Sequence, residues 1–452
     1  MMVAVTKDIN LFDFEMLGLA PELTSALSRA GLKQPTPIQN QAIPLALEGH
    51  DVMGLAQTGT GKTLAFGLPL VEHLLAEPGK PAPKTTKALI LAPTRELVNQ
   101  IAESLRMLTA DTRIKIACVV GGQSIGRQIS VLSRGTDILV ATPGRLMDLM
   151  DRGAVSLSSA RHLVLDEADQ MLDMGFIHAL RKIAPKLASP RQTMLFSATM
   201  PKQMEELSRA YLTNPRRVQV SPPGKAADKI TQSVHFLEKP HKPTKLREIL
   251  AADRDALTLV FARTKHGAEK LMKGLVADGF NAASIHGNKS QGQRDRAIKG
   301  FRDGQINVLV ATDVAARGID IPGVSYVINY ELPEVPDNYV HRIGRTARAG
   351  REGEAIAFCS NEEADLLYQI QKLMKIEIPV ASGDSPLNGN GDRPPRAASR
   401  RRGGGGGGGG RGGPGGGRKP QGKPQGKAFG GNGGGGGKPG AGKRRRTRRP
   451  AA

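Results

Sequence analysis

The sequence is poor in the residues that mark several classes of protein. Its 452 residues include no tryptophan, two cysteines and 4% aromatic residues. Cys118 and Cys359 lie far apart in apolar runs, so we expect two buried thiols and no disulfide framework or zinc site. No apolar run approaches the roughly 18 residues of a membrane span, and residues 1–14 lack the pattern of a signal peptide. We therefore expect a soluble, cytoplasmic protein with no membrane partner.

Acidic residues are scarce at one end of the chain. The net charge is +22, and residues 381–452 carry 17 Lys and Arg against 2 Asp, whereas the remaining 380 residues carry 47 basic and 40 acidic residues. This stretch is dominated by Gly, Pro, Arg and Lys, with Phe429 as its one aromatic residue. Such a composition cannot bury enough apolar surface to offset ordering, which predicts a disordered basic tail.

The tail has two Arg-Gly-Gly steps, at Arg402 and Arg411, and a basic cluster at residues 443–449. With little means of stacking on bases, it is expected to attract nucleic-acid phosphates without reading sequence. A solubilising segment and a nuclear address are the alternatives.

Short apolar runs alternate with helical patterns throughout residues 12–376, which favours an α/β fold with parallel sheets covered by helices on both faces. Residues 221–229 include Ser221-Pro222-Pro223-Gly224-Lys225 and show no periodicity, so we interpret them as a linker between domains at 12–220 and 230–376. Helices are expected over residues 267–277 and 293–301. The predicted strands cover residues 52–55, 88–91, 116–120, 138–141, 163–165, 194–196, 258–261, 283–285, 308–311, 326–329 and 355–358.

Residues 56–63 read AQTGTGKT and lie between a predicted strand and a predicted helix. Gly59 and Gly61 allow a tight turn whose N–H groups face phosphate oxygens, and the helix start adds its positive dipole end. Lys62 can reach the β- and γ-phosphates, and the Thr63 hydroxyl can hold Mg²⁺. The usual first glycine of such a loop is Ala56 here. A chance glycine-rich turn is the alternative interpretation.

Asp166-Glu167-Ala168-Asp169 directly follows His162-Leu163-Val164-Leu165, which contains the predicted strand 163–165. A carboxylate at this end of a buried strand can hold Mg²⁺, largely through water, and we assign that role to Asp166. Glu167 is the candidate to orient and activate the attacking water. A solvated strand end is the simpler alternative, which the phosphate loop a hundred residues earlier disfavours.

The ordered set of motifs resembles that of the DEAD-box RNA helicases over residues 12–375. In its general character, including residues 223–236, the sequence resembles the bacterial RhlE-type subgroup. The resemblance implies two tandem RecA-like domains, an RNA-stimulated ATPase, and ATP and Mg²⁺ as cofactors. The residues that carry it are GLKQPTPIQ at 31–39, AQTGTGKT at 56–63, PTREL at 93–97, Gly121-Gly122, TPGR at 142–145, DEAD at 166–169, SAT at 197–199, ATDVAARGID at 311–320 and HRIGRTARAG at 341–350.

The resemblance also implies roles for residues of the ATP site. Gln39 would bind the adenine edge and Phe14 would stack on the base. A hydrophobic staple into the first helix is the simpler interpretation of Phe14, and the two are compatible. The family often has glycine where Ala347 stands, a one-methyl difference that we expect to be tolerated. The ATP-binding set would be Phe14, Gln39, Thr58, Gly59, Thr60, Gly61, Lys62, Thr63, Gly318 and Asp320.

A further group would couple the nucleotide to closure of the two domains. Ser197 and Thr199 would form hydrogen bonds near Asp169, and His341 would belong to the same closed-state network; hydroxyls satisfied at a strand end are the alternative for the first two. Arg345 and Arg348 would be arginine fingers on the γ-phosphate.

RNA would cross both domains through backbone amides, hydroxyls and guanidinium groups, which suit phosphate and 2′-OH and are blind to base identity. The expected contacts are Pro93, Thr94, Arg95, Gly122, Thr142, Pro143, Gly144, Arg145, Arg263, Gly287, Arg294 and Thr312.

The sequence thus predicts an ATP-dependent RNA helicase that locally unwinds RNA duplexes or remodels RNA–protein complexes. An ATP-driven DNA translocase and a passive RNA chaperone that acts through its tail are the alternatives. Ribosome-assembly intermediates and the RNA-decay machinery are the usual settings of the subgroup, and no motif selects between them.

Overall fold

The structure is a computed structural model that describes residues 13–57, 59–77, 79–200, 202–220, 230–319, 321, 323–347 and 352–385. Several predictions fall outside these residues. They concern Thr58, Asp320, Arg348, the linker 221–229 and the part of the basic tail that begins at residue 386.

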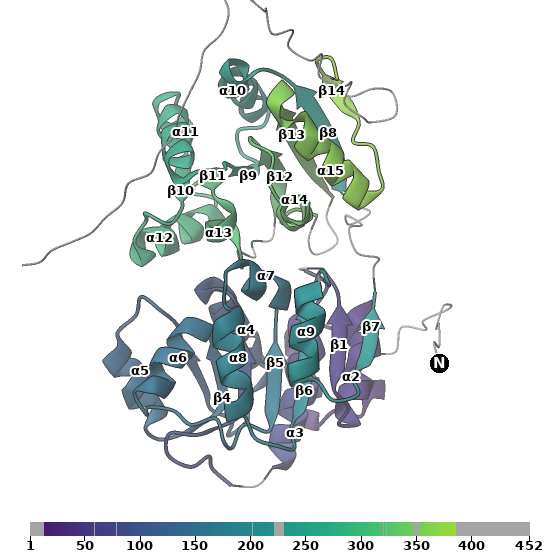
Figure 1. Cartoon of the computed structure of the whole chain (residues 1–452), viewed down its shortest axis with the longest axis vertical. Helices are drawn as coiled ribbons and strands as arrows, with labels where there is room; N and C mark the ends of the chain where they lie inside the picture. Colours follow the sequence, from purple (N-terminus) through teal and green to yellow (C-terminus); the bar gives the residue numbers. More distant parts are fainter. Residues whose placement is uncertain are drawn as a thin grey trace, which may run out of the picture. The chain divides into compact units, whose positions relative to one another are not determined.

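The first domain contains a seven-stranded sheet in the order β3-β4-β2-β5-β6-β1-β7, and every neighbouring pair is parallel (Figure 1). Its strands are β1 (Val52–Leu55), β2 (Thr86–Leu91), β3 (Ile116–Val119), β4 (Thr136–Ala141), β5 (His162–Leu165), β6 (Gln192–Ser197) and β7 (Arg216–Gln219). Its helices are η1 (Phe14–Leu17), α1 (Pro21–Arg29), α2 (Pro37–Leu47), α3 (Lys62–Ala76), α4 (Arg95–Leu108), α5 (Ile125–Leu132), α6 (Pro143–Asp151), α7 (Ala168–Asp173), α8 (Ile177–Ile183), η2 (Ala184–Lys186) and α9 (Lys202–Tyr211).

Successive side chains of these strands point to opposite faces of the sheet. In β2, Ala88 and Ile90 join a core with residues of α1 to α4, whereas Leu89 and Leu91 join a second core with residues of α6 to α9. Both faces of the sheet are therefore buried, which explains why its central strands read as continuous apolar runs.

The second domain has the same architecture, with strand order β10-β11-β9-β12-β13-β8-β14 and parallel neighbours throughout. Its strands are β8 (Ile230–Phe236), β9 (Leu257–Phe261), β10 (Ala282–Ile285), β11 (Val308–Ala311), β12 (Val324–Asn329), β13 (Gly353–Cys359) and β14 (Val380–Ser382). Its helices are η3 (Lys239–His241), α10 (Lys242–Ala252), α11 (Lys265–Ala277), α12 (Gln291–Arg302), α13 (Asp313–Ala316), α14 (Pro336–Ile343), η4 (Asn361–Glu363) and α15 (Ala364–Met374). Residues of α10 and α11 pack with Val260 and Val310, and residues of α12 and α13 pack with Leu259 and Leu309.

The predicted α/β fold is confirmed, and the predicted strands lie where expected to within two residues at either end. Three strands were missed: β7, β8 and β14. β7 is mostly exposed, β8 contains three consecutive polar residues, and β14 is exposed throughout, so none has the long buried apolar run of a central strand. The tail was predicted to begin at residue 381, but β14 extends to Ser382, so the first two residues of the predicted tail lie in a strand.

Five predicted functional residues are the caps of helices that begin at the carboxyl ends of strands. This is the edge of an open α/β sheet at which ligands bind, and the free N–H groups of a helix start suit phosphate. The caps are Gly61 of α3, Thr94 of α4, Thr142 of α6, Glu167 of α7 and Thr312 of α13.

In the part of the chain that the structure describes, no helix is both long and apolar enough to cross a bilayer. Neither cysteine is in a disulfide: Cys359 is buried and Cys118 is half-buried, against the prediction that both are buried.

Candidate active site and RNA-facing surface

The phosphate loop leaves β1 and enters α3 at Lys62. Gly59 and Gly61 have φ values of +84° and +93°, in the left-handed region that glycine adopts without strain. A Cβ atom at Gly61 would lie 2.4 Å from the Gln39 amide nitrogen, so any other residue there would displace that side chain as well as strain the backbone. The Thr60 hydroxyl donates to the Gln57 carbonyl oxygen at 2.7 Å and closes the turn. Sequence and structure therefore agree on the loop's local conformation.

Lys62 and Asp166 face each other at the base of this loop. The Lys62 Nζ atom lies 3.8 Å from Asp166 Oδ1, and both side chains are buried. This Nζ atom has no hydrogen-bond partner among the described residues. Burial raises the pKa of Asp166, and the charge of Lys62 opposes that shift. A buried carboxylate whose charge is incompletely balanced, beside an ammonium group with unused donors, fits a site for Mg²⁺ and phosphate.

Glu167 adopts an uncommon backbone conformation. Its φ and ψ are both +50°, a left-handed conformation that costs a residue with a Cβ atom of order 1–3 kcal/mol, and it caps α7 from there. The peptide nitrogen of Glu167 donates to Asp166 Oδ1 at 3.0 Å. Strain of this kind gathers at functional sites, where the surrounding structure holds a side chain in a required direction.

Asp169 connects the DEAD segment to the SAT segment. Its Oδ2 atom accepts hydrogen bonds from Ala198 N at 3.0 Å, Thr199 N at 2.9 Å and the Thr199 hydroxyl at 3.1 Å. The Ser197 hydroxyl donates to the Thr199 carbonyl oxygen at 2.8 Å, and the Asp169 peptide nitrogen donates back to Ser197 Oγ at 3.3 Å. The structure thus brings together the three first-domain residues that were predicted to couple the domains.

Gln39 and Phe14 have other contacts than the predicted ones to adenine. The Gln39 Nε2 atom donates to the Gly61 carbonyl oxygen at 2.9 Å, and its Oε1 atom accepts from Thr36 N at 2.9 Å. Phe14 is buried in the core of the first domain, the hydrophobic staple considered for it. The adenine contacts stay predictions, and the structure adds a direct link between Gln39 and the phosphate loop.

Among the second-domain residues assigned to ATP and to coupling, Arg345 is held by its own domain, whereas His341 and Gly318 lie against residues of the first domain. Arg345 is buried; its Nη1 donates to the Ile319 carbonyl oxygen at 2.8 Å and its Nε to the His341 carbonyl oxygen at 3.2 Å. His341 Nε2 lies 3.9 Å from Asp169 Oδ2. Gly318 has a φ of +72°, and a Cβ atom there would overlap the Thr94 hydroxyl.

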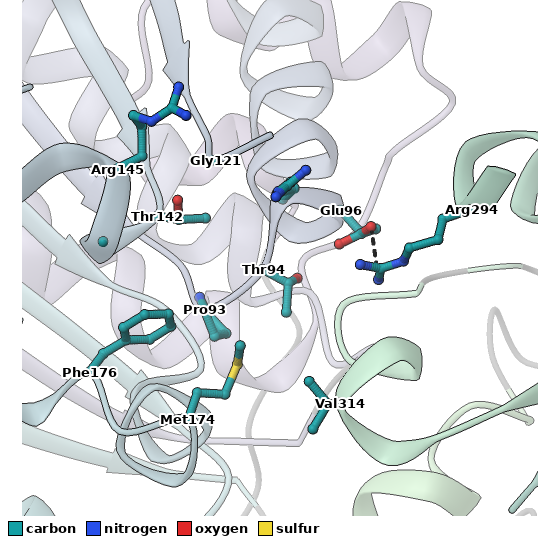
Figure 2. Close-up of a pocket in the computed structure, with 12 residues that line it drawn as sticks. Pro93, Thr94, Glu96, Gly121, Thr142, Arg145, Met174, Phe176, Arg294 and Val314 are labelled. Atoms are coloured by element: carbon teal, nitrogen blue, oxygen red, sulfur yellow. Dashed lines mark ion pairs between the residues drawn. The ribbon is translucent and has the colours of Figure 1, made fainter. Parts of the chain in front are cut away.

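A cavity of about 420 Å³ collects many of the residues predicted to bind RNA (Figure 2). Gly122 lies beside it with a φ of +71°, and a side chain there would collide with the Arg95 guanidinium group. Glu96 pairs with Arg294 at 3.1 Å on the same surface (Figure 2). The lining comprises Pro93, Thr94, Arg95, Glu96, Gly121, Thr142, Gly144, Arg145, Met174, Phe176, Arg294 and Val314.

Met174 and Phe176 of this cavity, and Arg342 outside it, were not among the functional residues predicted from the sequence. Met174 and Phe176 give the cavity an apolar side, yet in the sequence they resemble core residues. Arg342 is buried and holds both oxygens of Asp313, at 2.5 and 2.8 Å. It lies between His341 and Arg345 in HRIGR, so its motif was a signal that could have identified it.

The remaining second-domain residues assigned to RNA lie at strand ends. Thr312 caps α13, and its nitrogen donates to the Ile285 carbonyl oxygen at 3.3 Å. Gly287 follows β10 with open space around it. Arg263 follows β9 and is half-exposed.

The fold and the site define a class: a protein with two RecA-like domains whose first domain pairs a nucleotide-phosphate loop with an acidic strand end. The family described as DEAD/DEAH box helicase matches residues 36–207, and the helicase conserved C-terminal domain matches residues 241–350. The chain belongs to the DEAD/DEAH box helicase family, and it is an ATP-dependent RNA helicase with RNA-stimulated ATPase activity.

Among its relatives, the ATP-dependent RNA helicase CshA of Limosilactobacillus reuteri is 44% identical over 368 residues, which cover 81% of this chain and 72% of that protein. The DEAD-box ATP-dependent RNA helicase CshA of Bacillus subtilis is 42% identical over 362 residues, covering 80% and 72%. The structure of Saccharomyces cerevisiae Dbp5 bound to RNA and ADP BeF3 is similar with a TM-score of 0.73 and 32% identity, and the match covers 82% of this chain and 95% of that one.

Proposed function

We propose that RNA lies along the cavity lined by Thr94, Arg95 and Arg145 and is held through its phosphates and 2′-hydroxyls. The chemical character of the residues that line this cavity is the observation that supports the proposal. Hydroxyls, helix starts and guanidinium groups suit the backbone of a strand and carry no pattern that reads bases. The similar structure of Dbp5 holds RNA and ADP BeF3, which supports the same two classes of ligand for this chain.

We propose that ATP occupies the phosphate loop. Lys62 would contact the β- and γ-phosphates, and Thr63 and Asp166 would hold Mg²⁺, largely through water. The metal would offset phosphate charge during transfer. Glu167 would orient a water molecule and accept its proton as the water oxygen bonds to the γ-phosphorus and the bond to the ADP oxygen breaks. The strained Glu167 backbone and the buried Lys62–Asp166 pair support these roles.

We propose that closure of the two domains completes the site. Arg345 and Arg348 would then reach the γ-phosphate and Asp320 the ribose, whereas Gln39 of the first domain would bind the adenine edge. Hydrolysis would reopen the enzyme, and Asp169, Ser197 and Thr199 would carry the change from the DEAD segment into β6. The dense hydrogen bonding of Asp169 supports this last role.

The test compares RNA and DNA of one sequence in ATP-turnover and duplex-separation assays. RNA should stimulate turnover, and unwinding should require ATP. Stimulation by DNA to the same extent would support the DNA translocase, and unwinding without ATP would support an RNA chaperone that acts through its tail.

The subgroup and cellular setting are finer proposals. Residues 230–236 in β8 belong to the stretch that supports an RhlE-type assignment, whereas the relatives reported above are CshA proteins. We propose a cytoplasmic enzyme of ribosome assembly or RNA decay, with the basic tail as an added RNA-binding segment. Sequencing RNA crosslinked to the protein in cells tests the setting.

A further inference from the structure

The carboxylate of Glu363 organises a buried polar network in the second domain. Glu363 lies at the end of η4, and its side chain is 5% exposed. The two carboxylate oxygens accept hydrogen bonds from different segments of the second domain. Oε1 accepts from Arg263 Nη2 at 3.0 Å and Leu332 N at 3.1 Å, and Oε2 accepts from Lys242 Nζ at 2.5 Å, Ser360 N at 3.1 Å and Ser360 Oγ at 3.0 Å.

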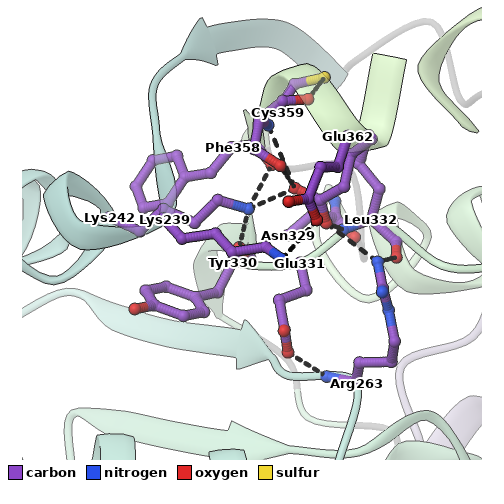
Figure 3. A network of polar contacts seen from close by, with 12 residues as sticks. Lys239, Lys242, Arg263, Asn329, Tyr330, Glu331, Leu332, Phe358, Cys359 and Glu362 are labelled. Carbon is purple, nitrogen blue, oxygen red and sulfur yellow. Dashed lines mark hydrogen bonds and ion pairs between the residues drawn. The ribbon is translucent and has the colours of Figure 1, made fainter. Parts of the chain in front are cut away.

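Lys242 is the buried cation of this network, at the start of α10. Its side chain is 3% exposed, and Nζ donates to the carbonyl oxygens of Tyr330 and Phe358 at 3.0 and 3.2 Å as well as to Glu363 (Figure 3). All three ammonium protons are therefore used, as a buried lysine requires. Burial alone would raise the pKa of Glu363, but Lys242 and Ser360 together hold that pKa below its ordinary value.

Arg263 is the exposed member of the network, with 34% of its side chain accessible. Its backbone nitrogen donates to Glu331 Oε2 at 2.7 Å, and its Nη2 atom donates to the Leu332 carbonyl oxygen at 3.1 Å and to Glu363 (Figure 3). The Nε and Nη1 atoms bond to no described residue. One edge of the guanidinium group is thus anchored, and its other donors are available to a ligand.

The balance of charge around Arg263 depends on Lys242. Glu363 holds the guanidinium group of Arg263 and Glu331 holds its backbone nitrogen, so two carboxylates face one arginine. Glu331 is partly accessible to water, which screens its charge, whereas Glu363 is buried and its charge is screened much less. Without Lys242, the local charge would repel a phosphate.

We propose that Glu363 and Lys242 are positioning residues for RNA: Glu363 fixes the guanidinium group of Arg263 toward an RNA phosphate, and Lys242 offsets the charge of Glu363. This inference rests on the proposed contact between Arg263 and RNA. A long side chain that is oriented before binding loses less conformational freedom on binding, so anchoring strengthens the contact without touching the RNA.

A double-mutant cycle tests whether Glu363 acts through Arg263. The full-length variants Arg263→Ala, Glu363→Gln and the two combined are compared by the poly(U) concentration that gives half-maximal ATP turnover. We expect each single variant to raise that concentration about ten-fold, the loss of roughly one charge-assisted contact. The combined variant should be no worse than Arg263→Ala alone.

Additive effects in the cycle would overturn the inference, because a purely structural role of Glu363 would persist without Arg263. A normal Glu363→Gln beside a weakened Arg263→Ala would overturn it as well. A normal Arg263→Ala would instead show that the RNA contact of Arg263 is wrong, and the inference would fall with it. Glu362→Gln is the matched control, because Glu362 is an exposed neighbour that pairs with Lys239, and it should bind poly(U) normally.

A charge-rescue experiment separates positioning from folding. Lys242→Met leaves the Glu363 carboxylate without its buried counter-ion, so affinity for poly(U) should fall most at low salt. Adding Glu363→Gln to Lys242→Met removes the excess negative charge and should recover part of that affinity. Thermal unfolding of each variant identifies loss of fold. If the Lys242→Met/Glu363→Gln variant binds poly(U) more weakly than both single variants, the two residues only support the fold and the inference is overturned.

Discussion

The Oδ2 atom of Asp169 accepts hydrogen bonds from both the backbone nitrogen and the hydroxyl of Thr199, at 2.9 and 3.1 Å. One carboxylate oxygen therefore fixes the backbone and the side chain of a residue 30 positions later. Asp169 is buried, and although burial would raise its pKa, the charges of His341 and Lys62 and the backbone N–H groups of Thr199 and Gln170 hold that pKa below its ordinary value. The DEAD and SAT segments are consequently held together by an ionised carboxylate.

Removing the hydroxyl should uncouple the two segments. In Thr199→Val the shape remains, and Asp169 loses one of its donors, so RNA unwinding should fall about ten-fold, by more than ATP turnover does. Thr199→Ser keeps the hydroxyl and should be close to the parent enzyme. Equal loss of unwinding and turnover in Thr199→Val would mean that the bond supports the ATP site rather than coupling.

Lys62 and Glu167 should fail in different ways. Lys62→Ala removes the charge for the phosphates, so both ATP affinity and turnover should fall, turnover by roughly 10²-fold or more. Glu167→Gln keeps the shape but cannot accept a proton, so ATP should still bind while turnover falls by about 10²–10⁴-fold. Binding of a fluorescent ATP analogue and phosphate release measure the two steps. Normal phosphate release by Glu167→Gln would disprove the proposed role of Glu167.

The central strands could be predicted because both faces of each sheet are buried, which leaves unbroken apolar runs such as residues 88–91. The edge strand β7 could not, since only Val218 of its four residues is buried. The hydrogen bonds of the edge strands come from neighbours far away in the chain, and no local pattern records them.

The same contrast holds for the site. The residues of the phosphate loop are neighbours in the sequence, so their types and spacing were enough to predict a phosphate-binding site. The network of Lys242, Arg263 and Glu363 spans 121 residues between its outer members and appears only when the second domain has folded. The link from Gln39 to Gly61 was likewise absent from the expectations, because a glutamine capping its own helix gives no sign of a second partner 22 residues later.

Gln39 should affect ATP binding through the phosphate loop. Gln39→Ala removes the donor to the Gly61 carbonyl oxygen, and we expect about ten-fold weaker ATP binding. Comparison of ATP with GTP separates the two roles of the amide. A loss confined to ATP indicates that Gln39 reads adenine, whereas equal losses for both nucleotides indicate that it only supports the loop.

Glu269 should make the second domain sensitive to acid. The Lys289, Ser284 and His286 donors lower the pKa of Glu269 to about 2, from an ordinary value of 4.5. Because the folded-state pKa is lowered, its stabilisation is complete above pH 4.5 and is lost as the pH falls toward 2. Glu269→Gln should lower the free energy of unfolding by about 1–2 kcal/mol at pH 7. The difference in thermal midpoint between this variant and the parent protein should become smaller below pH 4.5.

A gap that does not change with pH would show that Glu269 contributes only as a neutral hydrogen-bond acceptor. The same carboxylate holds His286, the residue before Gly287. Weaker RNA binding by Glu269→Gln at pH 7 is therefore expected alongside the loss of stability.

Ala347 carries a local strain that glycine should relieve. Its φ is +55°, in the left-handed region where a Cβ atom costs roughly 1–2 kcal/mol. Glycine removes that cost but adds about 0.5–1 kcal/mol of unfolded-state freedom, so Ala347→Gly should stabilise the second domain by a net ~0.5–1 kcal/mol. Ala277→Gly, at an exposed helical position, has no strain to relieve and should destabilise the domain by up to about 1 kcal/mol. Denaturant unfolding of both variants measures the difference. A less stable Ala347→Gly would mean that the Ala347 methyl group, which packs against the α14–α15 core, contributes more than its backbone strain costs.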